Sequence, residues 1–299
     1  MTACEIPSLN LPGQVLCAVQ EPATVVHQLE VAPRTFRMRL HSPEVARQIL
    51  PGQFFMLRSV DRTDPLLGRP FALLDIVRDA SGAVTGLDFG YVVVGKFTGL
   101  LSQLSAGSQL EIWGPLGNGF APPEQCHLAI VAGGIGQTPF VAVIREALGL
   151  EKYGDGSRSG FTPPRKITFC YGARTAQALA GTEWFEQLGV DVRLATDDGS
   201  RGHAGFVTGV LQNLMGSADP PTQIYCCGPE PLMRAVAKIS GAANIPAWLS
   251  LETPMACGFG ACFSCVARIR QPDGTWDYRR TCVEGPIFPA ADVIFAEEA

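Results

Sequence analysis

Hydrophobic and polar residues alternate in short runs along the first 120 residues, and this period of two predicts β-strands. Glycine, proline and aspartate separate the runs, as expected where strands reverse direction. The pattern predicts an antiparallel β-barrel over residues 14–120. The strands expected in it are Thr35–Leu40, Gln53–Leu57, Phe71–Val77, Leu87–Val94 and Ser108–Ile112.

After Cys126 the pattern changes to apolar strands that alternate with glycine turns and helical segments, which is typical of a parallel sheet. We expect an α/β domain over residues 125–246 and a small C-terminal segment over 247–299. The predicted fold class is therefore β + α/β, an antiparallel barrel followed by a parallel-sheet domain. The strands expected in the sheet are His127–Ala132, Ile167–Tyr171, Val190–Ala195, Gln223–Cys227 and Ala247–Leu251.

Composition and charge narrow the class of protein. The 299 residues are 46% hydrophobic, which is sufficient for well-formed cores, and the net charge of −5 with no basic run argues against a nucleic-acid surface. Residues 1–7 lack the features of a signal peptide, and the apolar stretches are too short or too interrupted to span a bilayer. We expect a cytoplasmic protein with reduced cysteines. Six cysteines are expected to be small buried hydrophobic residues, namely Cys4, Cys17, Cys126, Cys170, Cys226 and Cys227.

The other four cysteines have the spacing of an iron–sulfur site. Cys257, Cys262 and Cys265 form a C-x4-C-x2-C loop, and Cys282 follows after sixteen residues. Plant-type 2Fe-2S ferredoxins use this loop and a distant fourth cysteine, and the loop's glycines allow it to fold around sulfides. A structural zinc site is the main alternative and disulfides are another, although zinc usually favours two C-x2-C pairs.

Two glycine turns predict a nucleotide site in the α/β domain. The first contains Gly133, Gly134 and Gly136 and continues to Thr138, so that backbone and a helix N-terminus can approach a pyrophosphate. The second contains Gly228 and Pro229, again after a predicted strand. Ligands collect at the carboxyl ends of parallel strands, which favours binding over the alternative of tight turns without a ligand.

A third motif begins a predicted barrel strand. Arg69, Pro70, Phe71 and Ala72 place an arginine suited to a phosphate next to extended backbone that can meet the edge of a planar ring. Taken alone, such residues are more often an arginine and a proline at a strand edge.

Together these motifs resemble the electron-transfer subunits of type B dihydroorotate dehydrogenase, which are relatives of the ferredoxin-NADP reductases. The resemblance covers residues 14–290 and is most specific in the segments 251–262 and 282–288. It implies FAD in the barrel, NAD in the α/β domain and a 2Fe-2S cluster held by the four cysteines. A partner catalytic subunit would hold FMN and the dihydroorotate site, in a two-plus-two heterotetramer.

The resemblance also assigns flavin contacts. The segment from Arg69 to Ala72 would hold the phosphate and ring edge, Gly90, Tyr91 and Val92 would line the adenine or ribityl side, and Phe97 with Thr98 would cover the pyrophosphate. Four positions depart from the family's pattern. Ala72 replaces the Ser or Thr that is usual in the family, Val92 replaces a frequent Arg, Phe97 replaces a Gly, and Pro254 lies where an Arg is common.

The implied activity is electron transfer from the partner's FMN through 2Fe-2S and FAD to NAD⁺ in pyrimidine (UMP) biosynthesis, with no general acid or base in this chain. The turn after the strand Ile167–Tyr171 offers Arg174 but no basic cluster for the 2′-phosphate of NADPH, so we expect NADH to be preferred. Asp197 and Asp198 would repel that phosphate if they lay nearby. We expect the apolar residues beside the cluster to dock the partner, the alternative being internal packing. They are Phe259, Phe263, Ile287 and Phe288.

Three other functions compete. A phthalate dioxygenase reductase has a full ferredoxin domain, for which the tail is too short. A flavin and 2Fe-2S subunit of a hydrogenase or ferredoxin-dependent transhydrogenase shares most motifs and is the stronger alternative. A non-enzymatic module that senses NAD or stores zinc would lack the flavin and iron colour.

Overall fold

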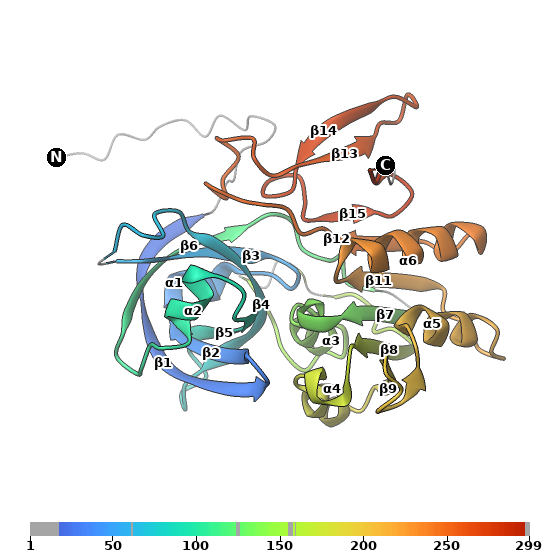
Figure 1. Ribbon diagram of the computed structural model, residues 1–299, viewed down its shortest axis with the longest axis horizontal. Helices are drawn as coiled ribbons and strands as arrows, with labels where there is room; N and C mark the ends of the chain where they lie inside the picture. Colours follow the sequence, from blue (N-terminus) through green and yellow to red (C-terminus); the bar gives the residue numbers. More distant parts are fainter. Residues whose placement is uncertain (1–17, 61, 124–125, 155–157, 159, 297–299) are drawn as a thin grey trace.

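The computed structural model describes residues 18–60, 62–123, 126–154, 158 and 160–296. Six antiparallel strands close into a barrel in the order β1-β2-β5-β4-β3-β6, with two short helices (Figure 1). The predicted barrel is confirmed. Its elements are β1 (Val19–Ala32), β2 (Thr35–His41), α1 (Pro43–Gln48), β3 (Phe54–Ser59), β4 (Arg69–Arg78), β5 (Val84–Val92), α2 (Lys96–Leu101) and β6 (Gln109–Leu116).

Strand β1 is the barrel strand that alternation did not predict. Its register against β2 shifts between Val25 and His27 and again between Glu30 and Ala32. Each shift interrupts the period of two, because an extra residue reverses which side chains face the core. Only Ala23 and Val25 of the strand are buried, so β1 joins the barrel mainly through its backbone.

A seven-stranded sheet forms the second domain, in the order β10-β9-β8-β7-β11-β12-β15, and every strand except β15 runs parallel to its neighbour. The predicted parallel sheet is thus confirmed. Its strands are β7 (His127–Gly133), β8 (Lys166–Ala173), β9 (Asp191–Thr196), β10 (His203–Ala204), β11 (Gln223–Cys227), β12 (Ala247–Ser250) and β15 (Ile287–Pro289).

Helices cover both faces of this sheet because its strands are apolar on both sides. Leu128 and Ile130 pack with α3 (Phe140–Ala147) and α4 (Thr182–Gln187). Ala129 and Val131 pack with α5 (Val207–Met215) and α6 (Glu230–Ala242) on the other face. The carboxyl ends of the strands therefore stay open, which is where parallel sheets bind ligands. Two short 3-10 helices complete the domain, η1 (Gly134–Gln137) and η2 (Ala176–Ala178).

The C-terminal segment contributes strands to the sheet and also contacts the barrel. Its strands β12 and β15 extend the sheet, while β13 (Val266–Arg270) and β14 (Trp276–Arg280) form a separate hairpin. The loop between β12 and β13 lies against the barrel, where Trp113 Nε1 donates a 2.9 Å hydrogen bond to the carbonyl of Cys257. The three-part division at residues 120–125 and 246–247 stays a prediction.

Contacts between side chains of the barrel and of the sheet domain fix the position of the two domains relative to each other. Arg145 of α3 pairs with Asp75 of β4 at 3.2 Å, and the Tyr153 hydroxyl donates to the same carboxylate at 2.7 Å. Arg37 of β2 stacks over the ring of Trp184 in α4, 5.4 Å from its centroid. These contacts hold the sheet domain against the barrel. No helix among the described residues is long and apolar enough to cross a membrane.

Candidate redox site

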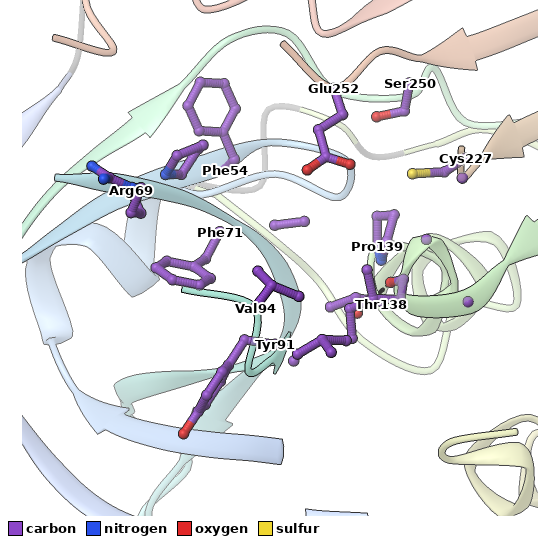
Figure 2. A pocket seen from close by; sticks show the side chains of 18 of the residues that line it. Phe54, Arg69, Phe71, Tyr91, Val94, Thr138, Pro139, Cys227, Ser250 and Glu252 are labelled. Carbon is purple, nitrogen blue, oxygen red and sulfur yellow. Dashed lines mark hydrogen bonds between the residues drawn. The ribbon is translucent and has the colours of Figure 1, made fainter. Parts of the chain in front are cut away.

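A cavity of about 760 Å³ lies where the barrel meets the carboxyl ends of the sheet strands. Figure 2 shows barrel side chains on one side of it and Pro139, Cys227 and Ser250 on the other. The lining includes every residue predicted to bind FAD or NAD. They are Arg69, Pro70, Phe71, Ala72, Gly90, Tyr91, Val92, Phe97, Thr98, Gly133, Gly134, Gly136, Thr138, Gly228 and Pro229.

Charge and shape in this cavity suit an anionic ring cofactor. Three basic side chains line it, Arg69, Lys96 and Arg174, and one acidic side chain, Glu252. Arg69 is exposed, and its Nη1 donates to the carbonyls of Leu67 and Gly68 at 3.0 Å, which leaves other guanidinium donors for a phosphate. The volume of the cavity is within the range that is usual for ligand sites.

Two predicted flavin residues turn their side chains away from the cavity. Phe97 is 2% exposed and packs in the barrel core, with its ring centroid 6.2 Å from that of Phe71. Tyr91 is also buried, and its hydroxyl donates to Gln28 at 2.8 Å. Burial raises the pKa of Tyr91. Both residues can therefore meet a ligand only through their backbone or a ring edge.

Thr98 has a structural role that the sequence did not reveal. Its hydroxyl accepts hydrogen bonds from the backbone N–H groups of Val94 and Gly95 at 2.9 and 3.1 Å and so orders the turn before α2. Val94 projects from this turn and is 81% exposed at the mouth of the cavity.

Close packing requires several of the predicted glycines on the sheet side. A Cβ on Gly136 would lie 2.4 Å from the carbonyl oxygen of Cys227, and one on Gly133 would lie 2.7 Å from Leu232. The turns after β7 and β11 therefore touch. Gly134 differs, because its φ of 55° and the open space around it leave its backbone accessible.

The end of β12 and the segment after it supply lining residues that the sequence prediction omitted. Ser250, Glu252, Thr253 and Met255 all line the cavity, and Figure 2 shows the carboxylate of Glu252 directed into it. Cys227, expected to be a buried hydrophobic residue, lies across from it at the cavity wall. Burial, with a smaller contribution from Glu252, raises the pKa of Cys227 to about 12, so it stays a thiol. Their position at carboxyl ends of parallel strands was the available signal.

The four predicted cluster ligands lie together beside this segment. Cys265 and Cys282 are buried with their sulfurs 3.1 Å apart, Cys257 is half-buried and Cys262 is exposed. Hydrogen bonds from Ser264 are the main cause that lowers the pKa of Cys262, to about 6, whereas burial raises that of Cys282. Among the described residues no three His, Cys, Asp or Glu side chains have the spacing of a single-metal site.

The loop around these cysteines fits a cluster. Gly258 and Gly260 have φ values of 82° and 90°, as a loop that folds over sulfides requires. The backbone of Gly260 acts to lower the pKa of Cys282 against the larger effect of burial, and backbone N–H groups beside cluster sulfurs stabilise thiolate ligands. A Cβ on Gly258 would lie 2.6 Å from Met56, so the loop is seated on the barrel wall.

A short hydrogen-bonded link joins the cavity to the cysteines. The hydroxyl groups of Thr253, which lines the cavity, and Thr281 are 2.5 Å apart. Thr281 is fully buried, and its backbone N–H and its hydroxyl both donate to the carbonyl of Cys265, at 2.8 and 3.1 Å. The cavity and the cysteine site are thus neighbours that share a wall.

Comparisons with known proteins agree with this arrangement. Residues 252–294 match the iron–sulfur cluster binding domain of dihydroorotate dehydrogenase B, and residues 130–238 match the oxidoreductase NAD-binding domain. The chain is 34% identical to the dihydroorotate dehydrogenase B (NAD(+)) electron transfer subunit of Desulforamulus reducens, over 91% of this chain and 97% of that one. It is 36% identical to the subunit of the same name from Geobacillus kaustophilus, over 92% and 98%.

Solved structures share the architecture. An NADH-dependent reduced ferredoxin-NADP oxidoreductase, described in work on flavin-based electron bifurcation, superposes with a TM-score of 0.73 at 25% identity, over 91% of this chain and 89% of that one. The ferredoxin reductase of carbazole 1,9a-dioxygenase gives a TM-score of 0.60 at 20% identity, over 76% and 67%, and shows the fold alone.

Proposed function

We propose a function for this chain from the fact that it belongs to the family of dihydroorotate dehydrogenase B electron transfer subunits. The chain passes electrons from a partner dihydroorotate dehydrogenase to NAD⁺ in pyrimidine biosynthesis, using FAD and a 2Fe-2S cluster. When bound, FAD supplies the exchange between single electrons and hydride that NAD⁺ needs. The observation that carries the proposal is the shared wall between the cavity and the cysteine site.

Individual residues have distinct roles in this proposal. Cys257, Cys262, Cys265 and Cys282 hold the cluster. Arg69 binds the flavin phosphate, while the backbone from Pro70 to Ala72 and from Gly90 to Val92 meets the rest of FAD, with Phe97 and Thr98 shaping the turn over it. Because Ala72 offers no hydroxyl, its contact is through backbone. The turns that contain Gly133, Gly134, Gly136, Thr138, Gly228 and Pro229 bind NAD.

The partner docks on the exposed side of the cluster loop. Phe259 and Phe263 are 52% and 62% exposed there. Leu66 and Leu67, also exposed, precede Gly68, whose backbone contacts the same Trp113 that bonds to Cys257. Ile287 and Phe288 do not belong to this surface, because both are only 6% exposed and pack in the sheet domain as part of β15. Apolar residues clustered at a redox centre favour docking of a protein.

Membership of this family supports a stoichiometry and weakens the competing function. We propose a heterotetramer of two electron transfer and two catalytic FMN subunits in the cytoplasm. The alternative, a subunit of a hydrogenase or transhydrogenase, is weaker. Relatives named for dihydroorotate dehydrogenase B are 34% and 36% identical, against 25% for the ferredoxin-NADP oxidoreductase.

Cofactor analysis of the isolated chain tests the proposal. Anaerobically purified protein is expected to hold about one FAD and about two irons with two acid-labile sulfides, and to reduce artificial dyes with NADH but not with dihydroorotate. Cys262→Ser should lose most iron and keep FAD, while Cys126→Ser, outside the cluster loop, should keep both. One equivalent of zinc without visible absorption would refute the cluster.

A further inference from the structure

Arg280 contacts each of the chain segments that carry the four cysteines. Its Nη1 donates to the carbonyl of Gly260 at 3.0 Å, between Cys257 and Cys262. Its guanidinium carbon lies 4.9 Å from the ring centroid of Phe263, between Cys262 and Cys265. Arg280 itself precedes Cys282 by two residues. One side chain therefore spans the whole cysteine site.

Glu284, two residues beyond Cys282, completes a pair with this arginine. Its Oε1 accepts from Arg280 Nη2 at 3.0 Å, and its Oε2 accepts from the backbone N–H of Arg280 at 2.9 Å. The side chains are 16% and 28% exposed. Their charges are thus partly shielded from water and remain effective over short distances.

These charges flank a site whose potential depends on charge. A 2Fe-2S core together with its four thiolate ligands carries a net negative charge, and reduction adds one more negative charge. Net charge and hydrogen bonding around the cluster set the reduction potential. A nearby cation favours the reduced form and a nearby anion the oxidised form.

We propose that Arg280 and Glu284 set the reduction potential of the cluster in opposite directions, with Arg280 also positioning the loop. Arg280 raises the potential by its charge, and Glu284 lowers it while holding the guanidinium in place. The inference rests on the proposed function, because it requires the cluster on Cys257, Cys262, Cys265 and Cys282.

Other contacts would hold the loop when this pair is altered. Trp113 bonds to the carbonyl of Cys257, and Gly258 packs closely on Met56 and Leu116. Thr281 bonds to the carbonyl of Cys265. We therefore expect Arg280→Gln and Glu284→Gln to fold and to keep iron, so that the change in charge can be measured by itself.

Arg279 provides the matched control. It is the neighbouring arginine on β14, and strand alternation places its side chain on the opposite face, where Nη2 donates to Gln271. Arg279→Gln removes the same charge from the same strand without touching the cysteine loop.

The test is a redox titration of the cluster followed by electron paramagnetic resonance, in the iron-loaded full chain. We expect Arg280→Gln to lower the midpoint potential and Glu284→Gln to raise it. In each case the ratio of reduced to oxidised cluster should change several-fold, tenfold being about 59 mV for one electron. Arg280→Lys should restore most of the potential, and Arg279→Gln should match the parent protein.

Shifts in the same direction for both glutamine variants, or shifts no larger than that of Arg279→Gln, would overturn the inference and leave only a structural role. If Arg280→Gln loses its iron, Arg280→Lys and Glu284→Gln decide between these outcomes. A parent protein without iron would instead contradict the proposed cluster, so the two failures are distinguishable.

Discussion

Glu146 in α3 is a carboxylate whose ionisation is opposed by its surroundings. Its side chain is 6% exposed and its Oε2 lies 2.9 Å from Arg158 Nη2, while Oε1 is buried without a hydrogen-bond partner. Burial is the main cause that raises its pKa to about 7, and Arg158 acts in the other direction. The folded chain therefore holds a proton on Glu146 at pH values where the unfolded chain has lost it.

This difference predicts a pH dependence of stability. Between about pH 4.5 and 7 the folded state binds more protons at Glu146, so its contribution to the free energy of unfolding falls as pH rises and is constant above about pH 8. The stability of the parent protein relative to Glu146→Gln should fall by on the order of 1 kcal/mol from pH 5 to pH 8. Thermal unfolding at the two pH values measures this, with exposed Glu44→Gln as control. A difference that grows with pH would contradict the assignment.

Motifs at the scale of single residues were the most predictable part of the site. Spacing alone predicted that the four cysteines form one site, and the structure places them together. The glycine turns and the Arg69 segment predicted residues that the structure brings together around the cavity. Glu252 and Ser250 were not predicted, and the only signal for them was their position at the carboxyl end of a predicted parallel strand. They line the cavity only because β12 lies next to β11 in the sheet. The inward direction of Phe97 likewise depends on barrel packing.

At the scale of elements, the paired ends of β8 and β9 lead into the residues that we expect to distinguish NADH from NADPH. The backbone N–H groups of Asp197 and Asp198 donate to the carbonyls of Ala173 and Arg174 at 3.1 and 3.2 Å. The backbones of both aspartates thus lie next to the turn that carries Arg174. Hydrogen bonds from Ser200 lower the pKa of Asp198, which keeps it ionised.

We predict that NADH is used more efficiently than NADPH and that Asp197→Asn narrows the difference. Loss of one exposed charge should raise kcat/KM for NADPH about two- to fivefold while that for NADH changes little. Steady-state dye reduction measures both values, and Asp273→Asn in the distant hairpin turn is the control. Equal efficiencies for the two nucleotides in the parent protein would refute the preference.

Five strands of the sheet were predictable, because apolar runs mark strands buried on both faces. They are β7, β8, β9, β11 and β12, whereas the two residues of β10 are too few to show a pattern. The barrel strand β1 was not predicted, because two register shifts break its alternation. The antiparallel addition of β15 was also hidden, since its three residues are too few for a period to be visible.

At the scale of the whole molecule, one exposed surface should decide whether the chain can find its partner. Phe259→Asp places a charge on the proposed docking surface without disturbing the stack of Arg280 on Phe263. We expect loss of complex formation, with iron, FAD and NADH-dependent dye reduction retained. Size-exclusion chromatography with the catalytic subunit measures the complex. Phe206→Asp, at a phenylalanine before α5 that is even more exposed than Phe259, should assemble normally, and assembly of both variants would show that docking occurs elsewhere.

The central claim is that this chain connects a dihydroorotate-oxidising partner to NAD⁺ through neighbouring cavity and cluster sites. Its most direct test is NADH formation from dihydroorotate and NAD⁺ when the purified chain is mixed with an FMN-containing dihydroorotate dehydrogenase subunit encoded beside it. We predict turnover that neither protein shows alone, and that is lost with Cys262→Ser. Turnover by the partner alone, or no turnover by a complex that contains FAD, FMN and iron, would contradict the account.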